Sequence, residues 1–363
     1  MKIILLYGGQ SAEHEISLIS AHNVAQVLMY SIYEVYPVFI TKSGQWIKGP
    51  RMETPSLGDQ QLILEASDTL SWSLENTPSK GIAIKPGDIQ SEEAVVFPIL
   101  HGPNGEDGTI QGFLEILDMP YVGAGITASA NGMDKIISKA LFTQAGIPQV
   151  PYVAFTAHEW EEQKESLMQK IEGSLLYPLF VKPANMGSSV GISCVHDSPE
   201  LIAAVATALR FDRRIIVEQG IQAQECEVAV LGNDDVHVSV VGHLVKDKSF
   251  YDYSEKYLNN SVQMEIPANL SEAVVEKIQD YAKKAYLAID GSGLSRVDFF
   301  VTTNEDVYIN EVNTMPGFTQ FSMYPSLWAA TGLEYRDLVE ELIQLALSRH
   351  ENKKQLEITQ VEH

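Results

Sequence analysis

The stretch SRVDFFVTTNEDVYINEVNTMPG, residues 295–317, constrains the fold more than any other segment of this 363-residue chain. Turn-forming residues at 303–306 separate two runs in which apolar and polar residues alternate, and this pattern predicts a β-hairpin. Alternate side chains of a strand lie on opposite faces, so the hairpin has an apolar face and a polar face. The chain therefore contains an antiparallel sheet with one strongly polar face.

The register of this hairpin decides which polar side chains share a face. The turn allows Val301 to pair with Val307 or with Tyr308, and we adopt Tyr308. That register gives two polar pairs, Asp298 with Glu311 and Arg296 with Asn313. Two carboxylates and a carboxamide are hard oxygen ligands, suited to Mg²⁺ that carries a nucleotide phosphate. The alternative is a solvated polar face, but acids packed so closely repel one another unless a cation offsets them. We therefore favour a metal site.

Strands and helices alternate in the first part of the chain, which predicts a parallel sheet of the α/β class. The predicted strands are residues 2–7, 34–40 and 94–100, with one helix at 12–29 and another that carries Ile110, Phe113, Leu114 and Leu117. Residues 50–92 are rich in Pro, Gly, Ser and acids, and we expect an insertion with a few short strands there.

After a predicted helix at 133–145, strands arrive in neighbouring pairs, which indicates α+β structure with antiparallel sheets. The predicted strands are 178–183 with 191–195, 214–218 with 226–231, 236–245, and 295–301 with 307–313. Helices are expected at 158–171, 198–208, 271–288 and 334–348. The last residues, 351–363, are predicted to form a polar, frayed tail.

Composition excludes several classes of partner. The net charge of −23 and the pI near 4.7 argue against a nucleic-acid partner, so any bound phosphate must be held by local cations and backbone N–H groups. No run approaches the ~20 apolar residues of a membrane span, and the N-terminal MKIILLYGG is predicted to be a buried strand instead of a signal peptide. The two cysteines, Cys194 and Cys226, are expected to be buried in a reducing compartment. We expect a cytoplasmic protein.

A glycine-rich loop follows a predicted strand in LFVKPANMGSSVGISCV, residues 179–195. Its N–H groups and hydroxyls, at Gly187, Ser188 and Ser189, are of the kind that cradles phosphate oxygens. The alternative is an ordinary hairpin turn. Two nearby lysines, Lys182 and Lys135, favour the phosphate site because each would supply a cation.

The segment GGQSAEHEISL, residues 8–18, links the first strand to the first helix. Ser11 is the expected N-cap, which places Glu13 and Glu15 in the first turn, where carboxylates stabilise the helix dipole. Ligands of open α/β sheets bind at this edge, so Glu13 would alternatively suit a substrate ammonium group. His101, at the end of the strand 94–100, lies at the same edge.

Seven segments in this order resemble the ATP-grasp superfamily and, within it, the D-alanine–D-alanine ligases. They are GGQSAEHEISL, LHGPNGEDGTIQG, MDKIISK, VKPANMGSSVGIS, FYDYSEKY, SRVDFFV and NEVNTMPG. The resemblance implies a Rossmann-like N-terminal domain followed by a two-part ATP-grasp fold. The implied domain limits are 1–123, 124–218 and 219–350.

The resemblance implies a reaction in two steps. ATP phosphorylates the carboxylate of one D-alanine, and the amine of a second D-alanine then displaces phosphate to give a dipeptide for peptidoglycan. Lys135 and Lys182 would neutralise phosphate charge, with two Mg²⁺ ions, replaceable by Mn²⁺, on Asp298, Glu311 and Asn313. Arg296 and the Gly317 N–H would stabilise the oxyanion.

Further roles come from the same resemblance. Glu13 would bind the first D-alanine's ammonium group with His101 nearby, and Ser322 would contact the second D-alanine's carboxylate. Glu218 and Glu225 would serve adenine and ribose. Glu218 is followed here by Gln-Gly-Ile where some relatives have Lys-Trp, which weakens the assignment of adenine contacts beyond the backbone. A homodimer is the family expectation.

The aromatic stretch SFYDYSEKYL, residues 249–258, is either an untidy strand end or part of a flap at 246–262. As a flap, it would bring Lys256 to the ATP phosphate and Tyr257 to Glu13 and Ser188. D-alanine–D-lactate ligases often carry Phe at the position of Tyr257, so the hydroxyl favours the dipeptide. The remaining alternative, a binding protein without catalysis, has no need for the combined metal and cation set.

Overall fold

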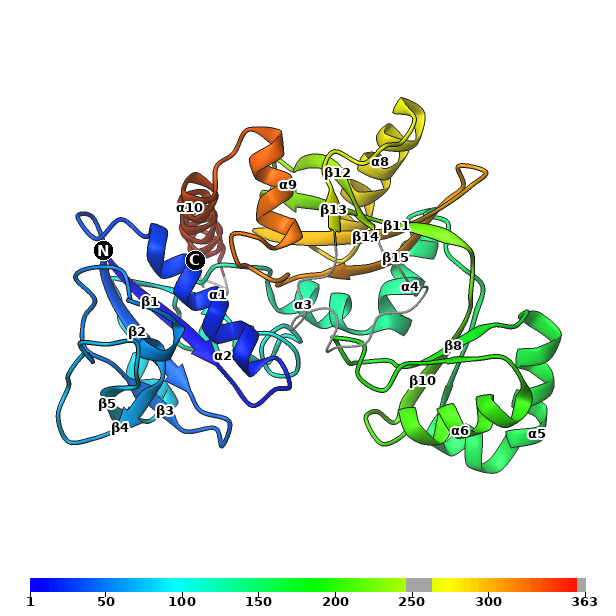
Figure 1. The fold of residues 1–363 in the computed structure, drawn as a ribbon, viewed down its shortest axis with the longest axis horizontal. Helices are drawn as coiled ribbons and strands as arrows, with labels where there is room; N and C mark the ends of the chain where they lie inside the picture. The colour runs from blue at the N-terminus through cyan, green and yellow to red at the C-terminus, as the bar shows by residue number, and fades with distance from the viewer. Residues whose placement is uncertain (246–262, 358–363) are drawn as a thin grey trace, which may run out of the picture.

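The computed structural model describes residues 1–245 and 263–357. Three sheets organise this part of the chain (Figure 1), and they have six, four and five strands. The six-stranded sheet lies at one end of the molecule and the four-stranded sheet at the other, with the five-stranded sheet between them. This confirms an α/β segment followed by antiparallel sheets. The domain limits drawn from the sequence stay a prediction.

The N-terminal sheet has the order β4-β5-β3-β2-β1-β6. Its strands are β1 (Lys2–Gly8), β2 (Glu34–Ile40), β3 (Trp46–Lys48), β4 (Leu64–Ala66), β5 (Ser79–Ile84) and β6 (Ala94–Ile99). The central strand β1 runs parallel to β2 and β6, whereas β3 is antiparallel to β2. The short strands expected within residues 50–92 are present as β4 and β5, with the 3₁₀ turns η1 (Asp59–Leu62) and η2 (Pro86–Ile89), and they extend the same sheet. That this segment is an insertion stays a prediction.

Alternation along β1 explains how this sheet acquires two buried faces. Ile3, Leu5 and Tyr7 pack in the cluster that contains α1 (His14–Val27) and α10 (Tyr335–Lys354). Ile4 and Leu6 pack in another cluster, with α2 (Thr109–Ile116). A sheet covered on both faces leaves its strand ends as the place where polar loops gather.

The four-stranded sheet is antiparallel with the order β7-β10-β8-β9. Its strands are β7 (Tyr152–Thr156), β8 (Leu179–Pro183), β9 (Ser193–Val195) and β10 (Arg214–Gln219). Helices α5 (Ala157–Ser174) and α6 (Ser198–Ala208) supply the apolar residues that pack with it.

The five-stranded sheet has the order β13-β12-β11-β14-β15. Its strands are β11 (Ala223–Leu231), β12 (His237–Val245), β13 (Gln263–Glu265), β14 (Leu294–Thr302) and β15 (Val307–Asn313). Helix α8 (Glu272–Ala288) packs with Val297 and Phe299, whereas α9 (Met323–Thr331) packs with Ala229 and Leu231. Helices α3 (Ile126–Met133) and α4 (Lys135–Gln144) precede the four-stranded sheet in the chain.

The predicted hairpin is present, but its register differs at the turn. Val301 pairs with Val307 and not with Tyr308, so that expectation was wrong. A β-bulge at residue 310 adds one residue to β15, because Asp298 pairs with Glu311 while Phe299 pairs with Ile309. The extra residue shifts the pairing by one position, so the strands beyond the bulge have the predicted register. Both predicted polar pairs are therefore confirmed.

Two helix boundaries of the N-terminal half also differ from the sequence prediction. Helix α1 begins at His14, and Glu13 instead of Ser11 is its N-cap, while the Ser11 hydroxyl accepts a hydrogen bond from the Glu13 N–H. The predicted helix 133–145 is broken at Asp134, whose carboxylate accepts hydrogen bonds from two N–H groups and caps α4.

Cys226 is buried as expected, but Cys194 is half-buried.

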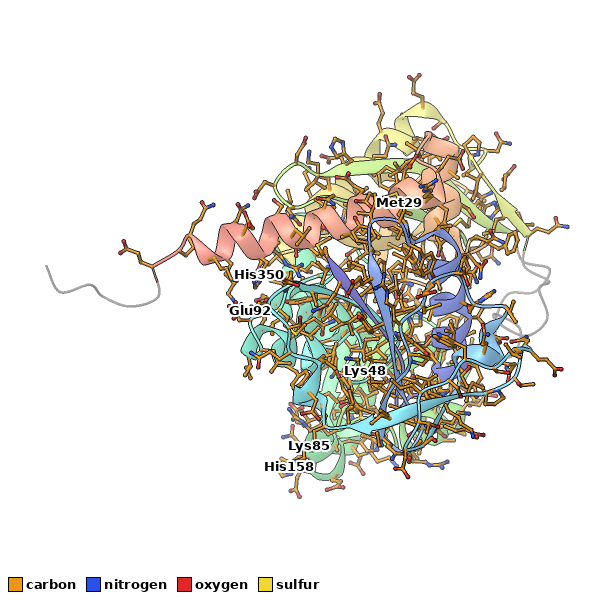
Figure 2. The ribbon with its side chains drawn as sticks, turned by 90° about the vertical axis from the view of Figure 1, so that its left-hand side faces the viewer. Met29, Lys48, Lys85, Glu92, His158 and His350 are labelled. Carbon is orange, nitrogen blue, oxygen red and sulfur yellow. The ribbon has the colours of Figure 1, made fainter. Side chains whose placement is uncertain are left out.

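Helix α10 extends further than predicted, to Lys354, so residues 351–354 are helical and not a frayed tail. Two ion pairs hold this end: Lys353 pairs with Glu115, and Lys354 pairs with Asp118 at 3.5 Å. His350 lies 3.6 Å from the same Asp118 carboxylate, and the last turns of α10 project from the body of the molecule (Figure 2). Over the described ranges, no helix is long and apolar enough to cross a membrane.

Arg349 ties α10 to the segment that leaves the N-terminal sheet. Its guanidinium donates hydrogen bonds to the carbonyls of Gly123 and Tyr121 and to the Ser292 hydroxyl, and it lies 4.4 Å from the centroid of the Tyr121 ring. Replacing Arg349 with Met removes all of these bonds and leaves two carbonyls without a donor.

We expect Arg349→Met to lower the free energy of unfolding by roughly 2–4 kcal/mol in urea titrations. Arg349→Lys keeps the charge but loses the planar guanidinium group. The free energy of unfolding of this variant should therefore lie between those of the wild-type chain and the Met variant. Equal stability of the Met variant and the wild-type chain would contradict this role.

Candidate active site

Two neighbouring cavities open where the three sheets approach one another. The smaller one holds about 60 Å³ and the larger about 190 Å³. Five residues line both cavities: Lys135, Met186, Gly187, Ser188 and Glu311. A ligand in one cavity would therefore lie against the same wall as a ligand in the other.

Most predicted site residues meet at these cavities. The smaller cavity is lined by Glu13, His101, Arg296, Asn313 and Gly317, and the larger by Lys182, Ser189, Glu218 and Glu225. Ser322 occupies the N-cap position of α9 and is not among the lining residues, although a Cβ added at Gly317 would lie 3.3 Å from its hydroxyl. Lys256, Tyr257 and the flap at 246–262 lie outside the described residues.

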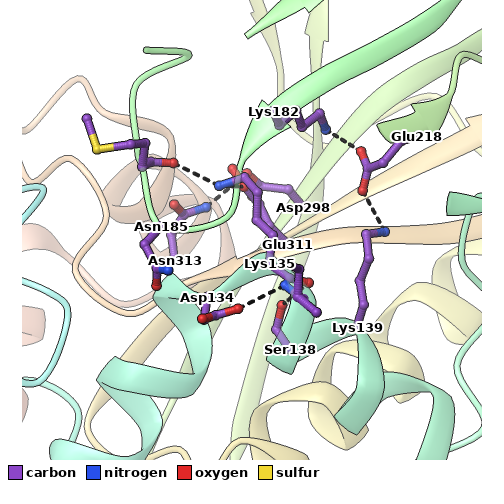
Figure 3. A network of polar contacts seen from close by, with 12 residues as sticks. Asp134, Lys135, Ser138, Lys139, Lys182, Asn185, Glu218, Asp298, Glu311 and Asn313 are labelled. Carbon is purple, nitrogen blue, oxygen red and sulfur yellow. Dashed lines mark hydrogen bonds and ion pairs between the residues drawn. The ribbon is translucent and has the colours of Figure 1, made fainter. Parts of the chain in front are cut away.

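The three predicted metal ligands lie at the junction of β14 and β15. Asn313 donates a hydrogen bond of 3.0 Å to Asp298, and Glu311 lies 3.4 Å from the Lys135 ammonium group (Figure 3). In donor chemistry, two carboxylates and a carboxamide oxygen on adjacent strands fit Mg²⁺. The described residues contain no group of three or more His, Cys, Asp or Glu side chains that would suit a metal by themselves.

Arg296 is held between two carboxylates. Its guanidinium donates two hydrogen bonds of 2.7 Å to Asp298, and its Nε also lies 2.9 Å from Glu227 Oε2. Glu227 is buried on β11 directly opposite Asp298. Sequence reasoning missed Glu227, although a charged residue between Cys226 and Val228 in an apolar strand was an available signal.

Glu13 connects the N-terminal loop to the glycine-rich loop, because it accepts a hydrogen bond from the Ser188 hydroxyl. Ser188 and Ser189 have φ values of 49° and 58°, in the left-handed region that non-glycine residues rarely adopt. Backbone strain of this kind is found at ligand-binding sites. A Cβ at Gly187 would lie 3.5 Å from both Glu13 and Glu106, so this loop passes close to two carboxylates.

Glu106, which the sequence analysis did not single out, lines the smaller cavity and accepts a 2.9 Å hydrogen bond from the Gly102 N–H. Burial and the neighbouring charge of Glu13 raise the pKa of Glu106 to about 8. The signal was present, since Glu106 belongs to the segment LHGPNGEDGTIQG. Around neutral pH, a proton on Glu106 therefore reduces the negative charge at this cavity.

His101 is 4% exposed at the same cavity. Its Nδ1 lies 3.1 Å from the Met315 carbonyl oxygen, which can only accept, so Nδ1 carries a hydrogen. Its Nε2 has no hydrogen-bond partner in the described part of the chain. Burial lowers the pKa of His101, which leaves a neutral ring whose Nε2 is an acceptor.

Glu218 on β10 is shared by two lysines. One of its oxygens lies 2.9 Å from Lys139 Nζ, and the other pairs with Lys182 (Figure 3). Burial acts to raise the pKa of Glu218, but the charges of Lys139 and Lys182 outweigh it and lower the pKa to about 2. Lys139 was not predicted, because a lysine within a helical pattern is normally a solvent-exposed residue.

Comparisons with known proteins agree with this arrangement. The family model "D-ala D-ala ligase N-terminus" matches residues 2–124, and "D-ala D-ala ligase C-terminus" matches residues 141–344. A D-alanine–D-alanine ligase from Enterococcus faecalis is 56% identical over 349 residues, which cover 96% of this chain and 99% of that protein. A D-alanine–D-alanine ligase from Listeria monocytogenes is 47% identical, with 98% of each chain covered.

Solved structures agree as well. The D-alanine–D-alanine ligase from Coxiella burnetii superposes with a TM-score of 0.78 at 34% identity, covering 98% of this chain and 96% of that one. The VanG D-Ala:D-Ser ligase from Enterococcus faecalis also has a TM-score of 0.78, at 35% identity, covering 95% of this chain and 99% of that one. The fold, the full-length identity and the two family models lead to one conclusion: the chain belongs to the D-alanine–D-alanine ligase family.

Proposed function

We propose that this chain joins two D-alanines to D-alanyl-D-alanine at the expense of ATP, through a D-alanyl phosphate, for peptidoglycan synthesis. The observation that carries the proposal is the wall shared by the two cavities. A nucleotide in the larger cavity and an amino acid in the smaller one would meet there, with the γ-phosphate next to a carboxylate. Phosphoryl transfer depends mainly on such positioning and on charge neutralisation.

In the larger cavity, Lys182 and Lys135 supply cations for the phosphates, and the N–H groups of the 187–189 loop supply donors. Glu218 and Glu225 line the part of the cavity proposed for adenine and ribose. Mg²⁺ held by Asp298, Glu311 and Asn313 would neutralise phosphate charge during the transfer. Lys256 is assigned to the same phosphates by family likeness alone.

In the smaller cavity, Glu13 binds the first D-alanine's ammonium group, and Arg296 with the Gly317 N–H faces its carboxyl group. Because the pKa of Glu106 is raised to about 8, a proton on Glu106 reduces the negative charge that faces the single ammonium group. When the second amine attacks the acyl phosphate, Arg296 and the Gly317 N–H stabilise the oxyanion.

Fewer of the described residues define the binding site of the second D-alanine. Ser322, proposed to contact its carboxylate, does not line either cavity, and Tyr257 lies outside the described residues. The likeness to a D-Ala:D-Ser ligase makes D-serine a specific competitor to test, alongside D-lactate. A homodimer and a cytoplasmic location belong to the same proposal and rest on family likeness.

Release of inorganic phosphate from ATP tests the proposed function. We expect release to depend on D-alanine, to be absent with L-alanine, and to yield the dipeptide as the main product when D-serine or D-lactate is also present. No D-alanine-dependent release would refute the ligase, and a dominant mixed product would favour a ligase that takes D-serine or D-lactate as its second substrate.

Glu311→Gln tests the metal site. The change keeps the size of the side chain but removes one negative charge from the ligand set, so turnover should fall by more than about 100-fold while the melting temperature stays near wild type. The matched control is Glu305→Gln, an exposed residue in the turn of the same hairpin. Wild-type turnover of the Glu311 variant would contradict the metal role.

A further inference from the structure

Lys139 is a buried lysine that the proposed reaction does not use. It lies on α4 one turn after Lys135, so both side chains project from the same side of the helix. Lys139 is 1% exposed, its ammonium group lies 5.3 Å from the centroid of the Tyr152 ring, and it does not line the larger cavity. A fully buried lysine is rare unless it is paired, so its partner shows what it does.

That partner is Glu218, which also binds Lys182 (Figure 3). Two ammonium groups and one carboxylate leave the three side chains with a net positive charge. Lys182 and Glu218 both line the larger cavity and Lys139 does not, so Lys182 is the ammonium group of this cluster that faces the space proposed for the nucleotide. Without Lys139, the same carboxylate would pair with Lys182 alone and cancel its charge.

The geometry also fixes the direction of Lys182. Glu218 is 3% exposed and is held on β10 opposite Phe180 and Tyr152 of the neighbouring strands. With one oxygen committed to Lys139, it holds Lys182 through the other oxygen only. A cation held in one direction needs less reorganisation when a phosphate arrives.

We propose that Lys139 is a positioning residue for nucleotide binding: by sharing the Glu218 carboxylate, it orients Lys182 and leaves it the positive charge that a phosphate group requires. The inference rests on the proposed nucleotide site in the larger cavity. Lys139 acts through Glu218 and Lys182 and does not itself touch the nucleotide.

Calorimetric titration of the full-length protein with ADP and Mg²⁺ tests this inference. We expect Lys139→Met to weaken ADP binding about tenfold, whereas Lys139→Arg, which keeps the charge, should stay within about threefold of wild type. In turnover assays, the Met variant should raise the KM for ATP more than it lowers kcat. Lys170→Met, an exposed lysine of α5, controls for the loss of one positive charge.

A double variant separates charge sharing from packing. Glu218→Gln alone measures what Glu218 itself contributes to ADP binding, and in that background no carboxylate remains to cancel the charge of Lys182. Adding Lys139→Met to Glu218→Gln should therefore weaken ADP binding by less than about threefold, compared with about tenfold in the wild-type background. A packing role predicts that Lys139→Met causes the same loss of ADP affinity in both backgrounds. Thermal unfolding of each variant verifies that it is folded, and the comparison of the double variant with Glu218→Gln carries the test if Lys139→Met does not fold.

Two results would overturn the inference: wild-type ADP affinity in Lys139→Met, or an equal loss of ADP affinity when Lys139→Met is introduced into the wild-type and the Glu218→Gln backgrounds. Failure of the wild-type protein itself to bind ADP would instead refute the proposed nucleotide site, so the two failures are distinguishable.

Discussion

The pairing of β14 with β15 is the constraint on which the site depends. It sets Asp298 opposite Glu311 and Arg296 opposite Asn313, and it does so with a bulge at residue 310. Two carboxylates brought so close would repel one another, but Arg296 binds Asp298 and Lys135 pairs with Glu311. This face of the sheet therefore presents positive and negative side chains next to one another. A divalent cation and a phosphate group could bind there together without reversing the local net charge.

The same logic explains how a chain of net charge −23 can offer a phosphate site. Within residues 1–245 and 263–357, the lysines and the arginine at the cavities are each paired with a carboxylate. Lys135 pairs with Glu311, Arg296 with Asp298 and Glu227, and Lys139 and Lys182 share Glu218. Buried ion pairs of this kind contribute little to the free energy of folding, because removing the two charges from water costs about as much as their attraction returns. Their value is orientation, which phosphoryl transfer requires.

Much of this site was predictable from the sequence because it depends on local patterns. The alternation of apolar and polar residues predicted the two faces of β14. The glycine and serine residues around Ser188 predicted a loop between two strands. The bulge at residue 310 was not predictable, since nothing in its residue types distinguishes it from the regular strand around it. Glu227 and Lys139 were missed because their partners are distant in the sequence, so only the folded chain reveals that they are paired. Asp134 broke a helix that its neighbours predicted to be continuous, because its side chain caps the N-terminus of α4.

The wall shared by the two cavities places a nucleotide phosphate next to a carboxylate, so the proposed reaction transfers a phosphoryl group between them. The fate of the carboxyl oxygens shows whether this transfer takes place. With D-alanine labelled with ¹⁸O in its carboxyl group and unlabelled ATP, formation and aminolysis of an acyl phosphate would carry one labelled oxygen into each inorganic phosphate released, as measured by mass spectrometry. Phosphate without the label, formed together with the dipeptide, would show that the carboxylate is never phosphorylated and would contradict the account.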